Sequence, residues 1–430
     1  MGTKPTRIHE VATETQRALL LIISSTSDTQ SQLERRAEEL SALVDTMGVA
    51  TERVEYVTLR QPNSSTLIGS GKVGELASII EELAVDMVIF EISLPPRIQR
   101  NLEQIWECAV IDRDEVILQI FADRAQTKEA VLQVELARLE YSLPRLTRKW
   151  THLSRQRGGM RGTRDAGETQ LEMDRRQISD KILLLKGQLE KVVTQRAVQR
   201  SQRLESSIPV GAIVGYTNSG KSSLLNALTG AGVLVEDKLF ATLDPTTRAV
   251  KLPGGEEILL SDTVGFVSNL PHTLVEAFKS TLEEALYADF LIIVCDASSP
   301  DMIANYTTTV QVLEELGATD KPAIVLANKI DKIEDGFSVS RLKSLYSPVI
   351  ETSIINAEGL DALVDEIVDL LKRLRPLSTY RIPTNRHDLV AHLHRWGQVQ
   401  KIEYTDDAII ATARIDGRYQ GPLAQFIKRD

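Results

Sequence analysis

The chain contains 430 residues, of which 42% are hydrophobic and 26% are charged, and its net charge is −10. This balance is typical of a soluble protein with several domains, and no apolar run approaches the roughly 20 residues that a membrane-spanning helix needs. The two cysteines, Cys108 and Cys295, match no metal or redox spacing and exclude a disulfide-rich secreted protein, so we expect a cytoplasmic protein without a membrane span.

The first 124 residues alternate between strand-like and helix-like segments. Apolar runs at 17–24, 53–59 and 86–91 are typical of buried strands, and a helical pattern follows the first of them at 29–47. Strands that alternate with helices pair in parallel, because each helix carries the chain back across the sheet. The sequence therefore predicts a small α/β domain over residues 1–124, with a mostly parallel sheet.

A helical segment follows over residues 125–206. Helical periodicity runs over 127–143 and again over 169–204, and the connection between them is rich in glycine and arginine. The window 145–206 holds 15 Lys/Arg and 7 Asp/Glu, so it carries +8 in a chain that is acidic overall. This pattern predicts an antiparallel helical hairpin with a basic tip. A basic tip is a candidate contact for a polyanion, although a solvated helical face explains the composition equally well.

The remainder of the chain predicts two further domains. Residues 207–374 alternate strand and helix again, which predicts an α/β domain with a mostly parallel sheet and helices on both faces. The two prolines in 374–383 are typical of a linker. The last segment, 384–430, predicts a small α+β domain with a helix near 387–396 and strands near 399–404 and 408–415.

A phosphate-binding motif lies near the start of the larger α/β domain. Residues 213–222 read IVGYTNSGKS and satisfy the GxxxxGK[ST] pattern, between an apolar strand and a helix. In that context a glycine-rich turn points successive backbone N–H groups at phosphate, Lys221 reaches the β- and γ-phosphates, and the Ser222 hydroxyl ligates Mg²⁺. The residues expected to contact the nucleotide here are Gly215, Tyr216, Thr217, Asn218, Ser219, Gly220, Lys221, Ser222 and Ser223.

A second motif distinguishes guanine from adenine. Asn328-Lys-Ile-Asp331 stands at the end of the apolar run 323–327. The Asp331 carboxylate can accept both the N1–H and the exocyclic NH₂ of guanine, whereas adenine offers neither in that arrangement and leaves the acceptor unpaired. Asn328 and Lys329 are expected to brace the base and the phosphate loop. The expected base-binding residues are Asn328, Lys329, Ile330 and Asp331, joined by Ser353, Ile354 and Ile355 of a later loop.

Two segments between these motifs are expected to sense the γ-phosphate. Asp262-Thr-Val-Gly265 follows an apolar strand, and there Asp262 would hold Mg²⁺ through a water while the Gly265 N–H meets the γ-phosphate. An earlier loop, 239–247, contains the threonine for Mg²⁺, for which we select Thr242, with Thr246 and Thr247 as alternatives. The expected nucleotide-binding residues of both segments are Phe240, Ala241, Thr242, Leu243, Asp244, Asp262, Thr263, Val264 and Gly265.

The residue after Gly265 is Phe266, at the position where many GTPases carry a glutamine that orients the attacking water. A phenylalanine side chain neither donates nor accepts a hydrogen bond, so we expect slow hydrolysis by the protein alone, with a partner or an ion completing the site. Asn218 stands where some GTPases place a ligand for a catalytic K⁺, although a side chain that only stabilises the loop is the more frequent role. The expected catalytic residues are Lys221, Asn218 and Gly265.

With these residues, the chain resembles the HflX family of ribosome-associated GTPases over nearly all of its length. The resemblance depends on Ile68-Gly-Ser-Gly-Lys-Val73, Gln133-Val-Glu-Leu136, Gly167-Glu-Thr-Gln-Leu-Glu172 and Phe240-Ala-Thr-Leu-Asp244. It implies the domain order predicted above, hydrolysis of GTP to GDP and phosphate, and Mg²⁺ at Ser222 and Thr242. It also implies binding to the large ribosomal subunit and a role in splitting or rescuing stalled ribosomes.

The glycine- and arginine-rich loop of the hairpin is the expected contact with ribosomal RNA. Its arginines can neutralise phosphates, and its glycines let the backbone follow a structured RNA. Arg145, Arg148 and Lys149 extend the same positive charge. The expected RNA-binding residues are Arg155, Arg157, Arg161 and Arg164.

The chain departs from the family pattern in two loops. Arg161 and Asp165 replace small residues in the hairpin loop, and Ser353-Ile-Ile355 replaces Ser-Ala-Lys in the base-binding loop.

A GTP-dependent ribosome assembly factor or regulatory RNA-binding adaptor fits the same residues without separating ribosomal subunits. An ATP-driven nucleic-acid enzyme conflicts with Asp331 at the guanine-reading position. We expect the protein to act as a monomer.

Overall fold

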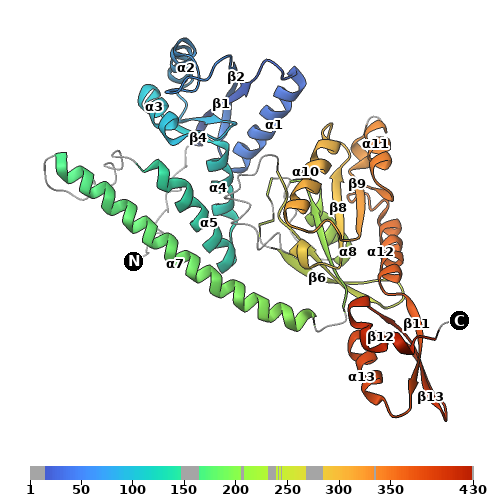
Figure 1. Ribbon diagram of the computed structural model, residues 1–430. Coiled ribbons are helices and arrows are strands. Elements are labelled where there is room, and N and C mark those ends of the chain that lie inside the picture. Colours follow the sequence, from blue (N-terminus) through green and yellow to red (C-terminus); the bar gives the residue numbers. More distant parts are fainter. Residues whose placement is uncertain are drawn as a thin grey trace, which may run out of the picture. The chain divides into compact units, whose positions relative to one another are not determined.

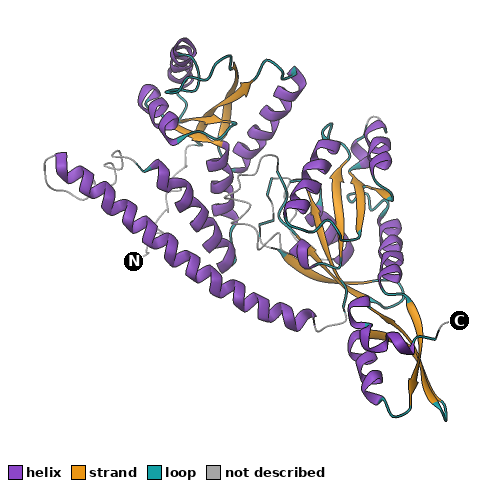
Figure 2. Ribbon diagram, viewed as in Figure 1, coloured by secondary structure: helices purple, strands orange, loops and turns teal. Residues whose placement is uncertain are grey.

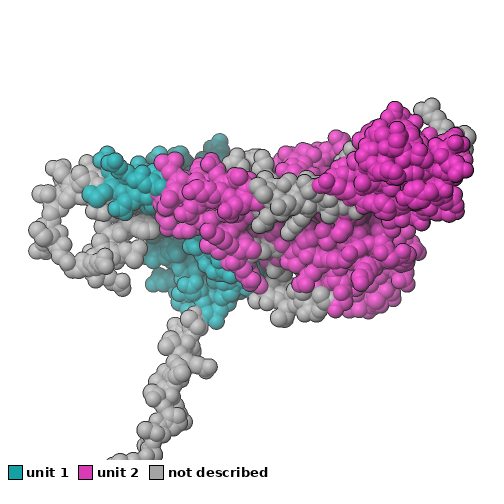
Figure 3. Space-filling model, turned by 90° about the horizontal axis from the view of Figure 1, so that it is seen from below, with its two compact units in different colours: residues 1–123, 137–180 teal, residues 124–136, 181–430 magenta. Residues whose placement is uncertain are grey.

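The computed structural model describes residues 15–146, 164–204, 208–230, 239–240, 242–243, 245–267, 284–333 and 336–428, with the side chains of 164–171, 196–204 and 418 outside this description. The chain divides into two compact units, one of residues 1–123 and 137–180 and the other of residues 124–136 and 181–430 (Figure 3). Among the described residues, no helix has the length and apolarity needed to cross a membrane. The domain limits expected from the sequence stay a prediction.

The first unit is built around a four-stranded parallel sheet with the order β2-β1-β3-β4 (Figure 1). β1 is a central strand, so its apolar run is buried on both faces of the sheet. The small α/β domain with a parallel sheet is therefore confirmed here. The strands are β1 (Arg17–Ser24), β2 (Ala50–Thr58), β3 (Met87–Phe90) and β4 (Ala109–Asp112), and the helices are α1 (Gln30–Thr46), α2 (Ser70–Leu83), α3 (Pro96–Trp106) and α4 (Arg113–Arg124).

Helix α1 begins where the sequence predicts because Thr29 caps it. The Thr29 hydroxyl accepts from the Gln32 backbone N–H at 3.3 Å, and the Gln32 side chain accepts from the Thr29 N–H at 2.8 Å. This reciprocal pair satisfies two donors that the first turn of a helix leaves unpaired. On one face of the sheet, Leu19 and Phe90 pack in a single apolar cluster with residues of α2 and α3.

The middle of the chain is helical. α5 (Lys128–Ser142) runs into a 3₁₀ turn, η1 (Leu143–Arg145), and α7 (Arg164–Leu204) is one helix of 41 residues (Figure 2). α7 begins at Arg164, before the predicted start at 169, and it includes Gly167. A glycine inside a helix costs about 1 kcal/mol, which does not by itself end the helix. Within the second unit, Lys181 Nζ lies 2.5 Å from Glu135 Oε1 of α5. Ile182 and Leu185 are buried positions on the same part of α7.

The second unit contains a six-stranded sheet with the order β10-β9-β8-β5-β7-β6, in which only the β6–β7 pair is antiparallel. The mostly parallel sheet predicted for this part of the chain is confirmed. Its strands are β5 (Val210–Gly215), β6 (Thr246–Lys251), β7 (Glu257–Asp262), β8 (Phe290–Asp296), β9 (Ala323–Asn328) and β10 (Val349–Thr352), and its helices are α8 (Lys221–Thr229), α10 (Met302–Glu315), α11 (Phe337–Leu345) and α12 (Leu360–Leu374).

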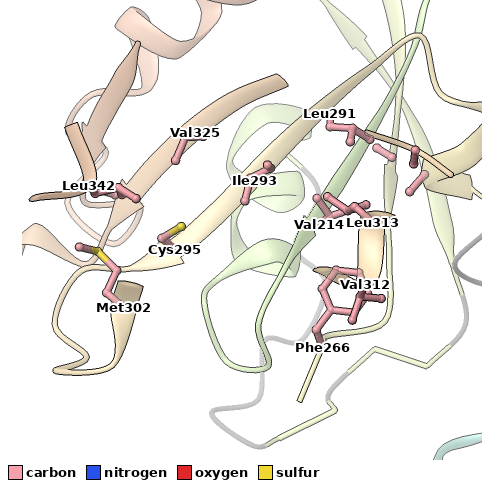
Figure 4. Packing of buried hydrophobic residues seen from close by; sticks show 14 of the residues in the cluster. Val214, Phe266, Leu291, Ile293, Cys295, Met302, Val312, Leu313, Val325 and Leu342 are labelled. Carbon is pink, nitrogen blue, oxygen red and sulfur yellow. The ribbon is translucent and has the colours of Figure 1, made fainter. Parts of the chain in front are cut away.

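Both faces of this sheet are covered by helices. Along β8, Leu291 and Ile293 point to the face covered by α10 and α11, where they join the cluster shown in Figure 4. Ile292 and Val294 point to the opposite face, where they pack with residues of α8 and α12. A strand buried on both faces reads as a continuous apolar run, which is why β8 and β9 are visible in the sequence.

A small sheet follows, and it corrects one expectation. The segment 374–383 was expected to be a linker, but Leu377–Pro383 forms strand β11, which pairs antiparallel with β13. Tyr380 and Ile382 are fully buried, so this strand contributes to the core. β11 is an edge strand of this sheet, where the proline at its end is tolerated. The predicted helix and two strands are confirmed as α13 (His387–Trp396), β12 (Gly397–Tyr404) and β13 (Ala408–Ile415), in the sheet order β11-β13-β12.

Candidate guanine-nucleotide site

The phosphate-binding motif forms the turn between β5 and α8. Gly215 has φ 150° and Gly220, the N-cap of α8, has φ 100°, which is backbone space that favours glycine. A Cβ on Gly215 would collide with Val294 O, and one on Gly220 would collide with the Asn328 side-chain amide. Both glycines are therefore required by conformation and by close neighbours. The turn ends at the N-terminus of α8, where an anion is stabilised.

Lys221 is a buried cation at the first position of α8. Its side chain donates to Tyr216 O at 2.8 Å, and the residue is only 6% exposed. Burial lowers the pKa of Lys221 to about 8, against the opposing effect of the Asp262 carboxylate. The Thr217 and Ser219 hydroxyls are also buried and have no hydrogen-bond partner among the described residues. This set fits a phosphate chain, because phosphate oxygens bring both negative charge and acceptors.

The three side chains expected to hold Mg²⁺ meet at one point. Ser222 Oγ donates to Asp262 Oδ2 at 2.6 Å and lies 2.7 Å from Thr242 Oγ1. Since a hydroxyl has one proton, Thr242 donates in the second contact. Asp262 is 2% exposed, burial raises its pKa, and its Oδ1 has no hydrogen-bond partner among the described residues. Hydroxyl and carboxylate oxygens are ligands that Mg²⁺ prefers, so the set fits that ion.

Gly265 lies against the phosphate turn. A Cβ at this position would come within 2.8 Å of Thr217 Cα and Cγ2 and within 2.9 Å of Lys221 Nζ. Real Cβ atoms do not make contacts this short, so only glycine fits without a shift of the turn. The close approach keeps the Gly265 backbone beside the Lys221 ammonium, where the sequence predicts the γ-phosphate.

Phe266 faces the core and not the nucleotide site. Its backbone is fixed to the phosphate turn, because Phe266 N–H donates to Gly215 O at 3.1 Å and Thr217 N–H donates to Phe266 O at 2.7 Å. Its side chain is 1% exposed and belongs to the same cluster as Val214 and Val312 (Figure 4). The position that carries a water-orienting glutamine in other GTPases therefore presents only backbone to the site.

The residues expected to bind the base lie at the ends of two adjacent strands, because β9 ends at Asn328 and pairs in parallel with β10, which precedes Ser353. The Asn328 side-chain amide donates to Ser219 O at 2.9 Å, and its carbonyl oxygen accepts from Ile354 N–H at 3.3 Å. Asp331 Oδ1 accepts from Ser353 Oγ at 2.6 Å. Asn328 thus joins the phosphate turn to the 353–355 loop, and the carboxylate of the exposed Asp331 is held by Ser353.

Other expected nucleotide-binding residues of the phosphate turn and of β7 differ in exposure. Asn218 is exposed and has φ 57°, in the left-handed region, whereas Tyr216 and Ser223 are half-buried. The Thr263 hydroxyl donates to the Ile213 carbonyl at 2.7 Å, so this residue links β7 to β5. Thr263 is therefore a structural contact between strands, with its hydroxyl already used.

The loop 239–247, which contains Thr242, is only partly described. Phe240 and Leu243 are each 2% exposed and anchor the segment on either side of Thr242, whereas Ala241 and Asp244 lie outside the described residues. Thr246 and Thr247, the alternative threonines, are the first residues of β6. The Thr247 hydroxyl lies 2.8 Å from Ser261 Oγ. Among these threonines, Thr242 is the one in contact with Ser222.

The last residue of β10, Thr352, makes one contact that the sequence did not indicate. The Thr352 hydroxyl is fully buried and donates to the Asn328 side-chain carbonyl at 3.4 Å. The position of Thr352 immediately before Ser353 was the sequence feature that could have indicated this contact. Ile354 is 9% exposed and packs in the core, whereas Ile355 is 77% exposed. Ile330, at the start of the short 3₁₀ turn η2 (Ile330–Lys332), is half-buried.

Arg145 does not belong to the predicted RNA-binding surface. Its guanidinium donates to Gln99 Oε1 at 2.9 Å, to Leu94 O at 3.0 Å and to Asp112 Oδ2 at 3.2 Å. It also lies over the Tyr141 ring, 3.4 Å from the centroid. Because Asp112 is fully buried, the arginine neutralises a carboxylate inside the first unit. The expectation that Arg145 neutralises phosphate is therefore wrong.

The rest of the predicted RNA-binding loop lies outside the description. Arg164 is the first residue of α7, and its side chain is not described. The assignment of this loop to RNA stays a prediction. The cations of the loop outside the described residues are Arg148, Lys149, Arg155, Arg157 and Arg161.

Comparison with known proteins identifies the family. Residues 34–122 match the family model of the GTP-binding GTPase N-terminal region, residues 124–203 match the GTP-binding GTPase middle region, and residues 210–329 match the 50S ribosome-binding GTPase model. The GTPase HflX of Treponema denticola is 50% identical to this chain, over 78% of this chain and 87% of the relative. The chain belongs to the HflX family of GTPases.

One further member of the family and one solved structure are also similar to this chain. The GTPase HflX of Akkermansia muciniphila is 42% identical, over 98% of this chain and 99% of the relative. A GTP-binding protein from Sulfolobus solfataricus, solved in complex with GDP, is 29% identical with a TM-score of 0.46, over 84% of this chain and 100% of that chain. As an HflX-family member, this protein is a GTPase and its ligands are GTP and GDP, which confirms the enzyme class expected from the sequence.

Proposed function

We propose that this HflX-family GTPase is a GTP-controlled factor that binds the large ribosomal subunit and splits or rescues stalled ribosomes. The observation that carries the proposal is the contact of Ser222 with both Thr242 and Asp262. It joins the loop before β6, the end of β7 and the phosphate turn through one hydroxyl. A ligand bound at this point orders the loop, and loss of that ligand releases it. A loop with two such states can report the nucleotide to a partner.

In this proposal the nucleotide is held from both ends. Lys221 binds the β- and γ-phosphates, and the Asp331 carboxylate accepts the two donors of guanine. Ser222 and Thr242 would ligate Mg²⁺, and Asp262 would hold it through a water. Bound there, the ion would neutralise charge on the phosphates. Two observations support these assignments: Asp262 Oδ1 is buried without a hydrogen-bond partner among the described residues, and the ammonium of Lys221 is buried.

Hydrolysis is slow in the protein alone and is accelerated by the ribosome. The Phe266 side chain is buried in the core, so it offers no group that orients the attacking water. A partner therefore completes the site. A K⁺ ion held by Asn218 is a second contribution, which the exposed position of that side chain supports. Equal hydrolysis rates in KCl and NaCl would remove K⁺ from the proposal.

Ribosomal RNA is the proposed partner of the basic hairpin loop. The family model matched by residues 210–329 describes a 50S ribosome-binding GTPase, which supports binding to the large subunit. The loop 147–163 is rich in arginine and glycine, a composition suited to phosphates of a structured RNA. The protein acts as a monomer in the cytoplasm. The residues proposed to contact RNA are Arg155, Arg157, Arg161 and Arg164.

Two measurements on intact ribosomes test this function. Light scattering should fall when the protein is added with GTP, because separated subunits scatter less light than intact ribosomes. The fall should be smaller with GDP. Sedimentation with large subunits should show binding that weakens steeply as salt rises. A variant with Arg155, Arg157 and Arg161 replaced by alanine should lose most of this binding and keep its affinity for GTP.

The matched control removes three exposed cations elsewhere, in Lys372→Ala, Arg373→Ala and Arg386→Ala, and should bind subunits as the unchanged protein does. Unchanged binding by the loop variant would refute the RNA contact. Binding that depends on GTP with no loss of light scattering would replace splitting with the alternative function of an assembly factor or adaptor.

A further inference from the structure

Asp296, the last residue of β8, holds a residue of the guanine-binding motif. Asp296 Oδ2 lies 2.7 Å from the ammonium of Lys329. Its other oxygen, Oδ1, accepts from the Ser298 N–H at 3.0 Å and from the Ser298 hydroxyl at 2.6 Å. Both carboxylate oxygens are therefore engaged, and the Ser298 contacts fix the orientation of the carboxylate that Lys329 meets.

The pair lies in a partly shielded place and at an unusual backbone position. The side chains of Lys329 and Asp296 are 17% and 21% exposed, so water screens their attraction less than that of a surface pair. Lys329 has φ 65° and ψ 36°, in the left-handed region that few side chains other than glycine and asparagine adopt. That conformation turns the chain from β9 into the 3₁₀ turn Ile330–Lys332, which carries Asp331. The direction of Asp331 therefore depends on how firmly Lys329 is held.

Each of the three polar residues of the motif, Asn328, Lys329 and Asp331, is held by a contact from outside the motif. Asn328 is held by Ser219 of the phosphate turn, Asp331 by Ser353 and Lys329 by Asp296. A backbone bond from Ala297 N–H to Asn328 O, 2.7 Å long, ties the Asp296 loop to the same strand end. The anchors on the phosphate turn and on Ser353 come from segments already assigned to the nucleotide, whereas Asp296 comes from a third segment.

We propose that Asp296 is a positioning residue for guanine: its carboxylate holds the Lys329 ammonium, keeps Lys329 in its left-handed conformation and so sets Asp331 toward the base. This inference rests on the proposed role of Asp331 in reading guanine. Asp296 contributes to binding of the base and not to the chemistry at the γ-phosphate.

The test separates base binding from hydrolysis. Asp296→Asn keeps the shape and the acceptor for Ser298 but removes the charge that holds Lys329. The dissociation constant for GDP, measured by calorimetry, should rise about tenfold, because one partner of a shielded charge pair is lost. The single-turnover rate at saturating GTP should stay within about twofold, because no phosphate contact changes. Ser298→Ala, which leaves the carboxylate in place, should raise the same constant about threefold.

Asp369→Asn is the matched control. Lys372 and Asp369 form a pair of the same 2.7 Å length on α12, but their side chains are 53% and 58% exposed. This variant should leave GDP affinity within about twofold of the unchanged protein, because exposed pairs contribute little. A rise of less than about threefold for Asp296→Asn, or a fall in rate as large as the fall in affinity, would overturn the inference. If Asp296→Asn does not fold, an unchanged GDP constant in Ser298→Ala would do the same.

A second arm separates this inference from the proposed role of Asp331. Asp331→Asn should bind xanthosine diphosphate in preference to GDP. Adding Asp296→Asn to this variant should weaken the binding of xanthosine diphosphate by the same factor by which Asp296→Asn alone weakens the binding of GDP. If Asp331→Asn keeps its preference for guanine, the role of Asp331 fails, whatever Asp296→Asn does. If the xanthine preference appears but the second substitution has no effect on it, Asp296 does not position the base.

Discussion

Replacing Glu115 by glutamine should stabilise the first unit at neutral pH. Glu115 lies in the first turn of α4 and is partly buried beside Asp112 and Tyr141. Burial and the negative charge of Asp112 together raise the pKa of Glu115 from 4.5 to about 7, against the opposing effect of Arg145. The folded protein therefore favours the protonated form, and a glutamine resembles that form at every pH.

The sign and size of the effect follow from the two pKa values. Between pH 4.5 and about 7 the folded state binds more protons at Glu115 than the unfolded state does. The contribution of Glu115 to the free energy of unfolding therefore falls as pH rises through this window and stays constant above it. Each unit of pKa corresponds to 1.36 kcal/mol, which sets an upper limit of about 3 kcal/mol. Since the carboxyl is only partly buried, we expect Glu115→Gln to gain about 2 kcal/mol at pH 8 and almost nothing at pH 4.

The assay is a urea titration followed by hydrogen exchange of peptides that cover β4 and α4, with both proteins compared at the same pH so that intrinsic exchange rates cancel. The control is Glu38→Gln, an exposed position on α1, which should change stability by less than about 0.5 kcal/mol at both pH values. A Glu115→Gln protein that is no more stable than the unchanged protein at pH 8, or that gains equally at pH 4, would refute the argument.

Three further substitutions have expected outcomes. Asp331→Asn should lower GTP affinity at least about hundredfold and transfer preference to xanthosine triphosphate, because charged hydrogen bonds contribute about 1.5–3 kcal/mol each; calorimetry that still favours GTP would contradict this. Arg145→Ala should cost the first unit about 3–5 kcal/mol, since the buried Asp112 loses its partner, and urea unfolding that detects less than about 1 kcal/mol would show the pair dispensable. Gly265→Ala should slow single-turnover hydrolysis about 100-fold, because the added Cβ would clash with Thr217 and shift the phosphate turn. An unchanged rate would contradict this prediction.

The sequence by itself determined the fold class and the nucleotide class. Strands buried on both faces appear as apolar runs, and the backbone conformation of a phosphate turn already favours glycine at Gly215 and Gly220. The proposed reading of guanine by Asp331 was predicted in the same way, because it depends on the functional group of that residue. These features are local: the information lies within a few residues of the chain, so no contact between distant segments was needed to predict them.

The tertiary structure decided which local patterns keep their expected roles. Arg145 looked like part of a basic surface, yet it pairs with the buried Asp112, and the segment taken for a linker forms β11 because β13 lies alongside it. The burial of Phe266 and the support of Lys329 by Asp296 were equally invisible in the sequence. The physical reason is common to all four: the free energy of a charge, a strand edge or an aromatic ring depends on what packs against it, and that neighbour comes from a distant part of the chain.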